Sequence, residues 1–322
     1  MTCTELAWTD CRTTPNADPT MPLYSEAHDR NPQISVPLQV GVVGAGTMGA
    51  GIVQVFLGAG DQVVLVDVSA EQLTRARTRI VDGLRRWEAK GQIASAEAAL
   101  ARLSFAGDVH AVAACPWVIE AVAEESGVKR AVFGDLGAVC RPDAILGSNT
   151  SSLSITAMGA ASGRPERTLG LHFFNPPPLM RLIEIVAGLR TAPEVVEAAT
   201  ALCVRLGKTP VRCKDRPGFL SNRILMPMVN EAFRVLEEGV GEPEALDHVF
   251  RLGMNHPMGP LELADLIGLD VCLAILEVLH TELGDPRFRP APLLRKHVEA
   301  GWLGRKTGRG VYTYPARPDD PG

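Results

Sequence analysis

One segment near the start of the sequence constrains its fold more than any other. A short apolar run, Val40 to Val43, ends in three spaced glycines, and a helical pattern follows from Met48 to Leu57. A second apolar strand pattern then ends at Asp67. Strand, glycine turn, helix and strand, in that order, open a doubly wound α/β domain. We therefore predict that a Rossmann-type parallel sheet forms the amino-terminal part of this protein.

The glycines have the spacing Gly-x-Gly-x-x-Gly, which predicts a dinucleotide site when the turn joins a strand to a helix. Gly44 permits the tight turn, Gly46 lets the backbone approach a pyrophosphate, and Gly49 allows the helix to pack closely on the strand. The helix N-terminus attracts the negative charge of the pyrophosphate. The alternative is a glycine turn that binds no nucleotide.

The acidic residue that ends the second strand, Asp67, favours one cofactor over another. Its carboxylate would accept hydrogen bonds from a ribose 2′-hydroxyl and repel a 2′-phosphate, and the following Val68 and Ser69 supply no arginine. The predicted cofactor is therefore NAD rather than NADP. The residues of this segment that we assign to it are Gly44, Gly46, Thr47, Met48, Gly49 and Asp67.

Strand patterns give way to helical patterns along the chain. Further strands are predicted at Trp117 to Glu120, Ala144 to Ser148, Thr168 to Phe173 and Leu182 to Val186. Beyond Asp215, helical patterns cover Asn222 to Glu238, Pro243 to Leu252, Pro260 to Leu283 and Pro292 to Ala300. The predicted fold class is α/β: a Rossmann-type doubly wound sheet at residues 37–215, then a C-terminal all-helical domain at 216–316. Residues 1–36 carry several prolines and no sustained apolar period, so we predict a disordered tail there, and we assign 317–322 to a second, short tail.

Composition argues against several classes of partner. The net charge of −5 predicts no nucleic acid and no anionic membrane as partner, and no apolar run approaches the ~20 residues that span a bilayer. The histidines show no HExxH or other close ligand spacing, so no metal site is predicted. The seven cysteines include no CxxC pair, which is typical of free thiols in a reducing cytoplasm.

Two neighbouring segments carry residues suited to acid–base chemistry. His172 lies at the end of an apolar strand pattern, and Glu184 lies in the middle of the next one. An isolated buried carboxylate is costly, so Glu184 needs a polar partner, and the short connection between the strands brings His172 beside it. A histidine titrates near neutrality, and a paired carboxylate fixes its tautomer and stabilises its charged form. The alternative is a core histidine without a catalytic role.

Two other segments offer polar groups for a ligand. The sequence Ser148-Asn-Thr-Ser-Ser152 follows a strand directly, at the end where α/β folds bind ligands. Asn222 lies at the start of the helical domain, where it can reach across the cleft between the two domains. In each case the alternative is an N-cap, by a residue of 148–152 for the next helix or by Ser221 or Asn222 for the following one.

A basic stripe follows the second strand. Arg75, Arg79, Arg86 and Lys90 recur at helical spacing along one face. Such a stripe beside a nucleotide site is suited to the phosphates of a second anionic ligand. A solvated helix face is the equally weighted alternative.

Six motifs together resemble a known family. GAGTMGAGIVQ, SNTSSL, HFFNPPPLMRLIEIV, CKDRPGFLSNR, MGPLELADLIGLD and LGRKTGRGVYTY are similar to motifs of the 3-hydroxyacyl-CoA dehydrogenases, including the bacterial 3-hydroxybutyryl-CoA dehydrogenases. The likeness runs from about Val40 to Tyr314 in the family's order. It implies an NAD-dependent enzyme that interconverts an (S)-3-hydroxyacyl-CoA, with a short acyl chain, and the 3-ketoacyl-CoA. It also implies a catalytic His172 paired with Glu184, with Ser151 and Asn222 holding the substrate oxygens.

The resemblance also assigns ligand contacts. Around NAD it implies Asp67, Glu124, Lys129 and Asn149, the last of which stands near both cofactor and substrate. The helical hairpin after the second strand binds coenzyme A in the family, which favours Lys90 as a substrate-binding residue. The helical half normally forms a homodimer interface.

Two departures from the family keep other hypotheses open. Gly83 stands where some relatives carry a serine that contacts coenzyme A, and the segment before residue 37 is longer than the family needs. One alternative is the same chemistry on a hydroxyacyl group bound to an acyl carrier protein in a biosynthetic pathway. Another is a crystallin-like protein that binds NAD without turnover, which the intact set of four catalytic residues argues against. Sugar-acid dehydrogenases share the fold but lack the HFFNP and SNTSS motifs.

Overall fold

The structure is a computed structural model that describes residues 37–315, all within one compact unit. The predicted tails at residues 1–36 and 317–322 lie outside the described residues. No helix within the described range is both long and apolar enough to cross a membrane.

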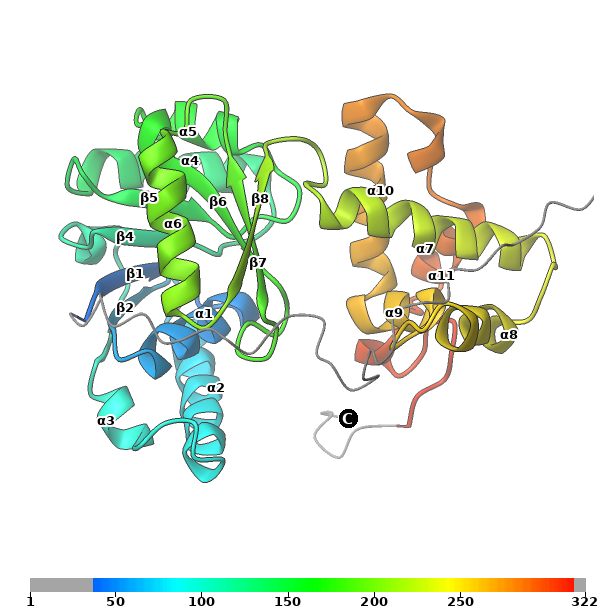
Figure 1. Cartoon of the computed structure of the whole chain (residues 1–322), viewed down its shortest axis with the longest axis horizontal. Helices are drawn as coiled ribbons and strands as arrows, with labels where there is room; N and C mark the ends of the chain where they lie inside the picture. Colours follow the sequence, from blue (N-terminus) through cyan, green and yellow to red (C-terminus); the bar gives the residue numbers. More distant parts are fainter. Residues whose placement is uncertain (1–36, 316–322) are drawn as a thin grey trace, which may run out of the picture. The chain divides into compact units, whose positions relative to one another are not determined.

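An eight-stranded sheet forms the first part of the described chain (Figure 1). Its order is β3-β2-β1-β4-β5-β6-β7-β8, and every neighbouring pair is parallel except β6 and β7. The order of the first six strands is that of a Rossmann fold, so the predicted α/β class is confirmed. The strands are β1 (Gln39–Val43), β2 (Gln62–Val66), β3 (Leu103–Ala106), β4 (Trp117–Glu120), β5 (Ile145–Ser148), β6 (Thr168–Phe173), β7 (Leu182–Ala187) and β8 (Thr209–Lys214).

The sequence patterns do not predict the two edge strands, β3 and β8. Neither strand contains a fully buried residue, because each has a neighbouring strand on one side only. The six inner strands are predicted from their continuous apolar runs. A half-exposed edge strand needs no such run, so the pattern does not reveal it.

Helices cover both faces of the sheet. On one face α1 (Thr47–Gly58), α2 (Ala70–Ala89) and α6 (Pro193–Arg205) share an apolar core that includes Phe56, Leu84 and Leu202. On the other face α4 (Ser126–Val139) and α5 (Ile155–Ala161) share a second core that includes Phe133 and Met158. Side chains along each strand alternate between these cores, as strand geometry requires. The shorter helices of this part are α3 (Ala96–Leu100) and the 3₁₀ turns Val109–Val112 and Pro165–Arg167.

The rest of the described chain is helical (Figure 1). It has its own apolar core, in which Met226, Phe233 and Leu276 are fully buried. The helices are α7 (Ser221–Glu237), α8 (Pro243–His248), α9 (Pro260–Ile267), α10 (Leu269–Leu283) and α11 (Pro292–Glu299), with 3₁₀ turns at Pro286–Phe288 and Arg305–Thr307.

Two predicted helices of this part need correction. The pattern from Pro260 to Leu283 is two helices, α9 and α10, that meet at Gly268, whose φ of +108° is a conformation that favours glycine. The apolar period continues across the break because both helices bury residues in the same core. The pattern from Pro243 to Leu252 starts as α8 and continues as a π-helix over Val249–Gly253.

Sheet order brings the candidate site residues to one edge. Strand order reverses between β1 and β4, and ligands of open α/β sheets bind beside the carboxyl ends at such a point. At this edge the glycine turn follows β1, and the segment 148–152 begins with the last residue of β5. His172 is the penultimate residue of β6.

Candidate active site

In the glycine turn after β1, two of the three glycines lie where there is no room for a side chain. Gly44 has φ +107°, and a Cβ there would lie 2.5 Å from the carbonyl oxygen of Ala121. A Cβ at Gly49 would lie 1.8 Å from the carbonyl oxygen of Gly44, so the first turn of α1 packs directly on the glycine turn. Both positions therefore exclude a side chain for reasons within the fold itself.

Gly46 differs, because a Cβ there would meet no atom within 4 Å. It is the N-cap of α1, with no side-chain hydrogen bond to the cap and no acidic residue in the first turn. Open space in front of a helix N-terminus without a side-chain cap suits an anion, which the exposed N–H groups and the helix dipole attract. The residues present therefore fit the pyrophosphate of a dinucleotide.

Asp67 connects the glycine turn to the end of β2. One carboxylate oxygen accepts from the backbone N–H of Ala45 at 2.7 Å, and the other accepts from Ser69 at 2.8 Å. Each carboxylate oxygen has a second lone pair, so Asp67 retains acceptors for ribose hydroxyls. The same side chain thus fixes the turn and remains suited to the predicted ribose contact.

His172 and Glu184 face each other across two antiparallel strands. They are direct partners in the register of β6 and β7, and His172 Nδ1 lies 2.8 Å from Glu184 Oε2. The predicted contact between the two side chains is therefore present. A carboxylate only accepts, so Nδ1 carries the hydrogen and leaves Nε2 as the acceptor of a neutral imidazole. The His172 ring lies 4.6 Å from that of Phe174 and 6.0 Å from that of Phe219, measured between centroids.

The start of α7 completes the surroundings of Glu184. Ser221 donates to this carboxylate from its backbone N–H and from its hydroxyl, both at 2.8 Å, and the backbone N–H of Leu220 donates at 3.2 Å. Burial alone would raise the pKa of Glu184, but the hydrogen bonds from His172 and Ser221 outweigh it and lower the pKa below its ordinary value. Glu184 is thus an anion at neutral pH and gives His172 a fixed acceptor.

The loop after β5 is organised around Glu124. One oxygen of this carboxylate accepts from Thr150 Oγ1 at 2.6 Å, from the Ser151 N–H at 2.8 Å and from Ser151 Oγ at 3.0 Å. Burial would raise the pKa of Glu124, yet the nearby Lys129 cation and these hydrogen bonds lower it below its ordinary value. The carbonyl oxygen of Ser151 in turn accepts from Asn222 Nδ2 at 3.1 Å, so the structure brings Ser151 and Asn222 together.

The alternative N-cap roles are wrong at both places. The N-cap of α5 is Ser154, outside 148–152, and its hydroxyl accepts from the Ala157 N–H. The N-cap of α7 is Leu220, and no side chain caps this helix. The hydroxyl of Ser221 and the amide of Asn222 are instead bonded to Glu184 and Ser151.

Two further residues predicted around NAD are nearly buried. The Asn149 side-chain oxygen accepts from the Phe173 N–H at 2.9 Å, which joins the ends of β5 and β6. Lys129 is 1% exposed and forms an ion pair with Glu120 at 2.6 Å and with Glu124 at 3.2 Å. Glu120 is not among the residues that the sequence patterns predict for the site. The available signal is a carboxylate in an otherwise apolar strand, although Glu120 ends its strand whereas Glu184 lies within one.

The basic stripe lies along the exposed side of α2, with Lys90 as the C-cap residue that follows it. Arg75, Arg79, Arg86 and Lys90 are all exposed, and Arg75 pairs with Glu71 at 2.5 Å. These contacts do not distinguish a ligand-binding stripe from a solvated face, so the role of Lys90 stays a prediction.

Gly83 is buried between α1 and α2. A Cβ there would lie 2.1 Å from Gln54 Oε1, so a serine at this position requires the Gln54 side chain to move.

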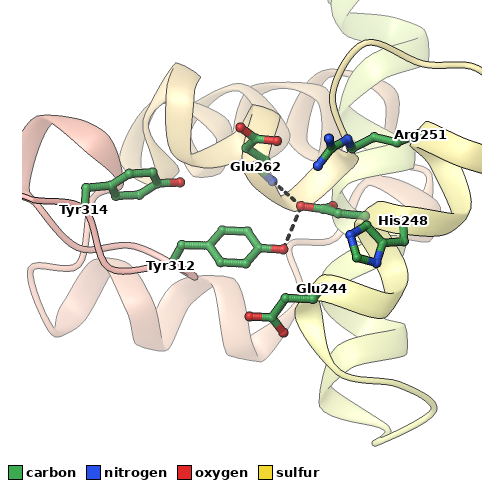
Figure 2. Close-up of a pocket in the computed structure, with 7 residues that line it drawn as sticks. Glu244, His248, Arg251, Glu262, Tyr312 and Tyr314 are labelled. Carbon is green, nitrogen blue, oxygen red and sulfur yellow. Dashed lines mark hydrogen bonds between the residues drawn. The ribbon is translucent and has the colours of Figure 1, made fainter.

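A cavity of about 300 Å³ lies in the helical half, lined by residues other than those predicted for the site (Figure 2). Its wall includes Asp247, which accepts from the N–H groups of Leu261 and Glu262 at the start of α9 and from the Tyr312 hydroxyl at 2.8 Å. Burial, reinforced by Asp247, raises the pKa of Tyr312. Through Asp247, which lies in α8, these contacts join Tyr312, α8 and the start of α9, which is a structural role. Within residues 37–315, no group of three or more His, Cys, Asp or Glu side chains is placed to hold a metal ion.

Comparison with known proteins agrees with this geometry. The model of the NAD-binding domain of 3-hydroxyacyl-CoA dehydrogenase matches residues 39–216, and that of the C-terminal domain matches 218–314. A probable 3-hydroxybutyryl-CoA dehydrogenase from Deinococcus radiodurans is 51% identical over 278 residues, which is 86% of this chain and 100% of that protein. The 3-hydroxyadipyl-CoA dehydrogenase of Escherichia coli is 48% identical over 280 residues, 86% of this chain and 59% of that protein.

A solved structure is also similar. The (S)-3-hydroxybutyryl-CoA dehydrogenase of Ralstonia eutropha has a TM-score of 0.83 and 46% identity, and the match covers 87% of this chain and 100% of that one. The two family models together span nearly all described residues. The chain therefore belongs to the 3-hydroxyacyl-CoA dehydrogenase family of NAD-dependent oxidoreductases.

Proposed function

We propose that this protein interconverts (S)-3-hydroxyacyl-CoA and 3-ketoacyl-CoA thioesters of short acyl chain, with His172 and Glu184 as the acid–base pair. The observation that carries the proposal is the 2.8 Å hydrogen bond between these side chains at the edge of the sheet where the glycine turn opens. The names of relatives support the substrate class, and one of them specifies the (S) enantiomer.

The chemistry of the proposal begins with a proton at the histidine. In oxidation, the 3-hydroxyl of the substrate gives its proton to His172 Nε2, the nitrogen that does not face Glu184. The imidazolium that forms is stabilised by the Glu184 carboxylate, which the hydrogen bonds from Ser221 hold in place. In reduction the same nitrogen returns a proton to the oxygen. NAD, when bound, supplies the acceptor for the hydride that leaves C3.

The residues proposed to hold NAD are those at the open end of α1 and along the same edge. The N–H groups of Gly46 and Thr47, at the uncapped N-terminus of α1, are proposed to bind the pyrophosphate, and Asp67 offers its free lone pairs to the ribose. Ser151 and Asn222, joined by a hydrogen bond, are proposed to hold the substrate oxygens.

The decisive assay is consumption of NADH with acetoacetyl-CoA and its longer homologues. We expect the highest kcat/KM with acetoacetyl-CoA, formation of the (S) product, and a lower rate with the same acyl group on an acyl carrier protein. A preference for the carrier-protein thioester would mean that the substrate is an acyl carrier protein thioester and not a coenzyme A thioester. NADH binding seen by fluorescence, without turnover of any thioester, would contradict the proposed activity altogether.

We further propose that the protein is a homodimer that associates through its helical half. Three large apolar side chains there, Val249, Leu252 and Met254, follow one another closely and are each more than half exposed. Adjacent exposed apolar side chains of this kind are typical of a surface that binds another protein.

A further inference from the structure

A fully buried carboxylate lies beneath the candidate site. Glu120 is 0% exposed and ends β4, directly beside the last residue of β1 in the sheet register. Its oxygens accept from Lys129 Nζ at 2.6 Å, from the Val122 N–H at 2.7 Å and from Ser148 Oγ at 2.7 Å. Each of these donors belongs to a different segment: α4, the β4–α4 connection and the end of β5.

The contacts continue from this carboxylate to the predicted substrate residues. Lys129 pairs with Glu124 at 3.2 Å, and Glu124 holds Thr150 and Ser151 through the hydrogen bonds described above. Ser148 Oγ, besides donating to Glu120, accepts from the Thr150 N–H at 3.2 Å. Two routes therefore connect Glu120 to the loop 148–152: one through Lys129 and Glu124, the other through Ser148.

Three protein acceptors lie close to the ammonium group of Lys129. Lys129 Nζ donates to Glu120 at 2.6 Å and to the Val122 carbonyl oxygen at 3.3 Å, and it forms an ion pair with Glu124 at 3.2 Å. With 1% of its side chain exposed, Lys129 is surrounded by protein acceptors. Neutralising Glu120 would remove the shorter of the two ion pairs that stabilise this buried charge, which is unfavourable.

We infer that Glu120 is a positioning residue: together with Lys129 it holds Glu124 and the loop 148–152, and thereby Ser151, in the arrangement that substrate binding requires. The kinetic part of the inference rests on the proposed function, whereas its structural part concerns the protein without ligands.

The structural part is tested by hydrogen–deuterium exchange of peptides that cover residues 148–153, without ligand. Glu120→Gln keeps the shape of the side chain but removes the charge that faces Lys129. We expect exchange in this peptide to rise by roughly tenfold or more, because Lys129 then holds Glu124, the acceptor of the Ser151 N–H, less firmly. Unchanged exchange would overturn the inference.

Two more variants separate positioning from general destabilisation. Asp61→Asn is the matched control, because Asp61 is also 0% exposed and paired with an arginine, Arg205, at 2.6 Å, but it precedes β2 at the opposite end of the strands. We expect a lower Tm but unchanged exchange at 148–153. Ser148→Ala removes one of the two routes and should raise exchange in the same peptide, which provides the test if Glu120→Gln does not fold.

The kinetic part is tested with acetoacetyl-CoA and NADH. We expect Glu120→Gln and Glu124→Gln each to lower kcat/KM by roughly 10–100-fold. The kcat/KM of the double variant should lie within about threefold of that of the less active single variant, because both residues act on one loop. Losses that multiply would mean that Glu120 does not act through Glu124. If the wild-type protein turns over no thioester, the proposed function fails, while the exchange measurement still decides the positioning role.

Discussion

His172 and Glu184 lie twelve positions apart in the sequence, and a 2.8 Å hydrogen bond joins their side chains. We expect His172→Gln to lower kcat by roughly 10²–10⁴-fold, because glutamine can fill the space and hydrogen-bond to Glu184 but cannot take up a proton. The Kd for NADH, measured by fluorescence, should change little. Near-normal turnover by this variant would remove His172 from the mechanism.

The charge of Glu184 makes a testable contribution to stability. Its pKa in the folded protein is lowered below the ordinary 4.5, so its ionised form is favoured by folding. The stabilisation is present above pH 4.5 and is lost as the pH falls through the folded value. We expect the difference in unfolding free energy between wild type and Glu184→Gln, from urea titrations, to narrow as the pH is lowered below 4.5. A difference in unfolding free energy that does not change with pH would show that the hydrogen bonds of Glu184 stabilise the protein and its charge does not.

At the scale of elements, the glycines of the turn between β1 and α1 have different roles: Gly49 is needed for folding, and Gly46 is predicted to be needed for NADH binding. A Cβ at Gly49 collides with the Gly44 carbonyl oxygen at 1.8 Å, whereas a Cβ at Gly46 meets nothing within 4 Å. Gly49→Ala should therefore lower Tm markedly, with a cost of about 2 kcal/mol or more. Gly46→Ala should leave Tm nearly unchanged but weaken NADH binding by roughly tenfold or more, because the methyl group occupies the space of the pyrophosphate.

Calorimetry and NADH titration of the two alanine variants test this difference. Weak NADH binding by a Gly46→Ala protein of normal stability is the result that assigns the open space to the cofactor. Equal NADH affinity in Gly46→Ala and wild type would contradict the predicted role of this glycine.

Elements with a buried apolar face are the ones that sequence patterns predict well. Six inner strands and the long helix α7 appear within a few residues of their expected bounds. The edge strands β3 and β8 have no fully buried residue and escape the pattern. The break at Gly268 escapes it for the opposite reason: α9 and α10 share one core, so the apolar period continues through the break.

At the scale of the whole molecule, we expect the wild-type protein to sediment at twice the mass of one chain. Leu252→Glu should shift it toward the monomer, because a charge in an apolar interface must be desolvated without a partner. Leu189→Glu is the matched control: Leu189 is 86% exposed and Leu252 82%, but Leu189 follows β7 in the sheet part. A wild-type monomer, or dissociation by both variants alike, would contradict an interface at Leu252.

The sequence by itself determined what depends on neighbours along the chain. The glycine turn, the acid at the end of β2 and the pairing of His172 with Glu184 all follow from local spacing, because a short connection between two strands leaves few arrangements open. The family resemblance added the identities of Ser151, Asn222 and the residues around NAD.

Only the tertiary structure decided which polar groups satisfy one another. Ser221 and Asn222 look like capping residues in the sequence, but the start of α7 lies against β7 and the loop after β5, so their side chains bond to Glu184 and Ser151. Glu120 looks like the end of a strand, yet three separate segments supply its donors. The physical reason is that a buried carboxylate must find hydrogen-bond donors wherever the fold brings them, and their distance along the chain leaves no trace in local pattern.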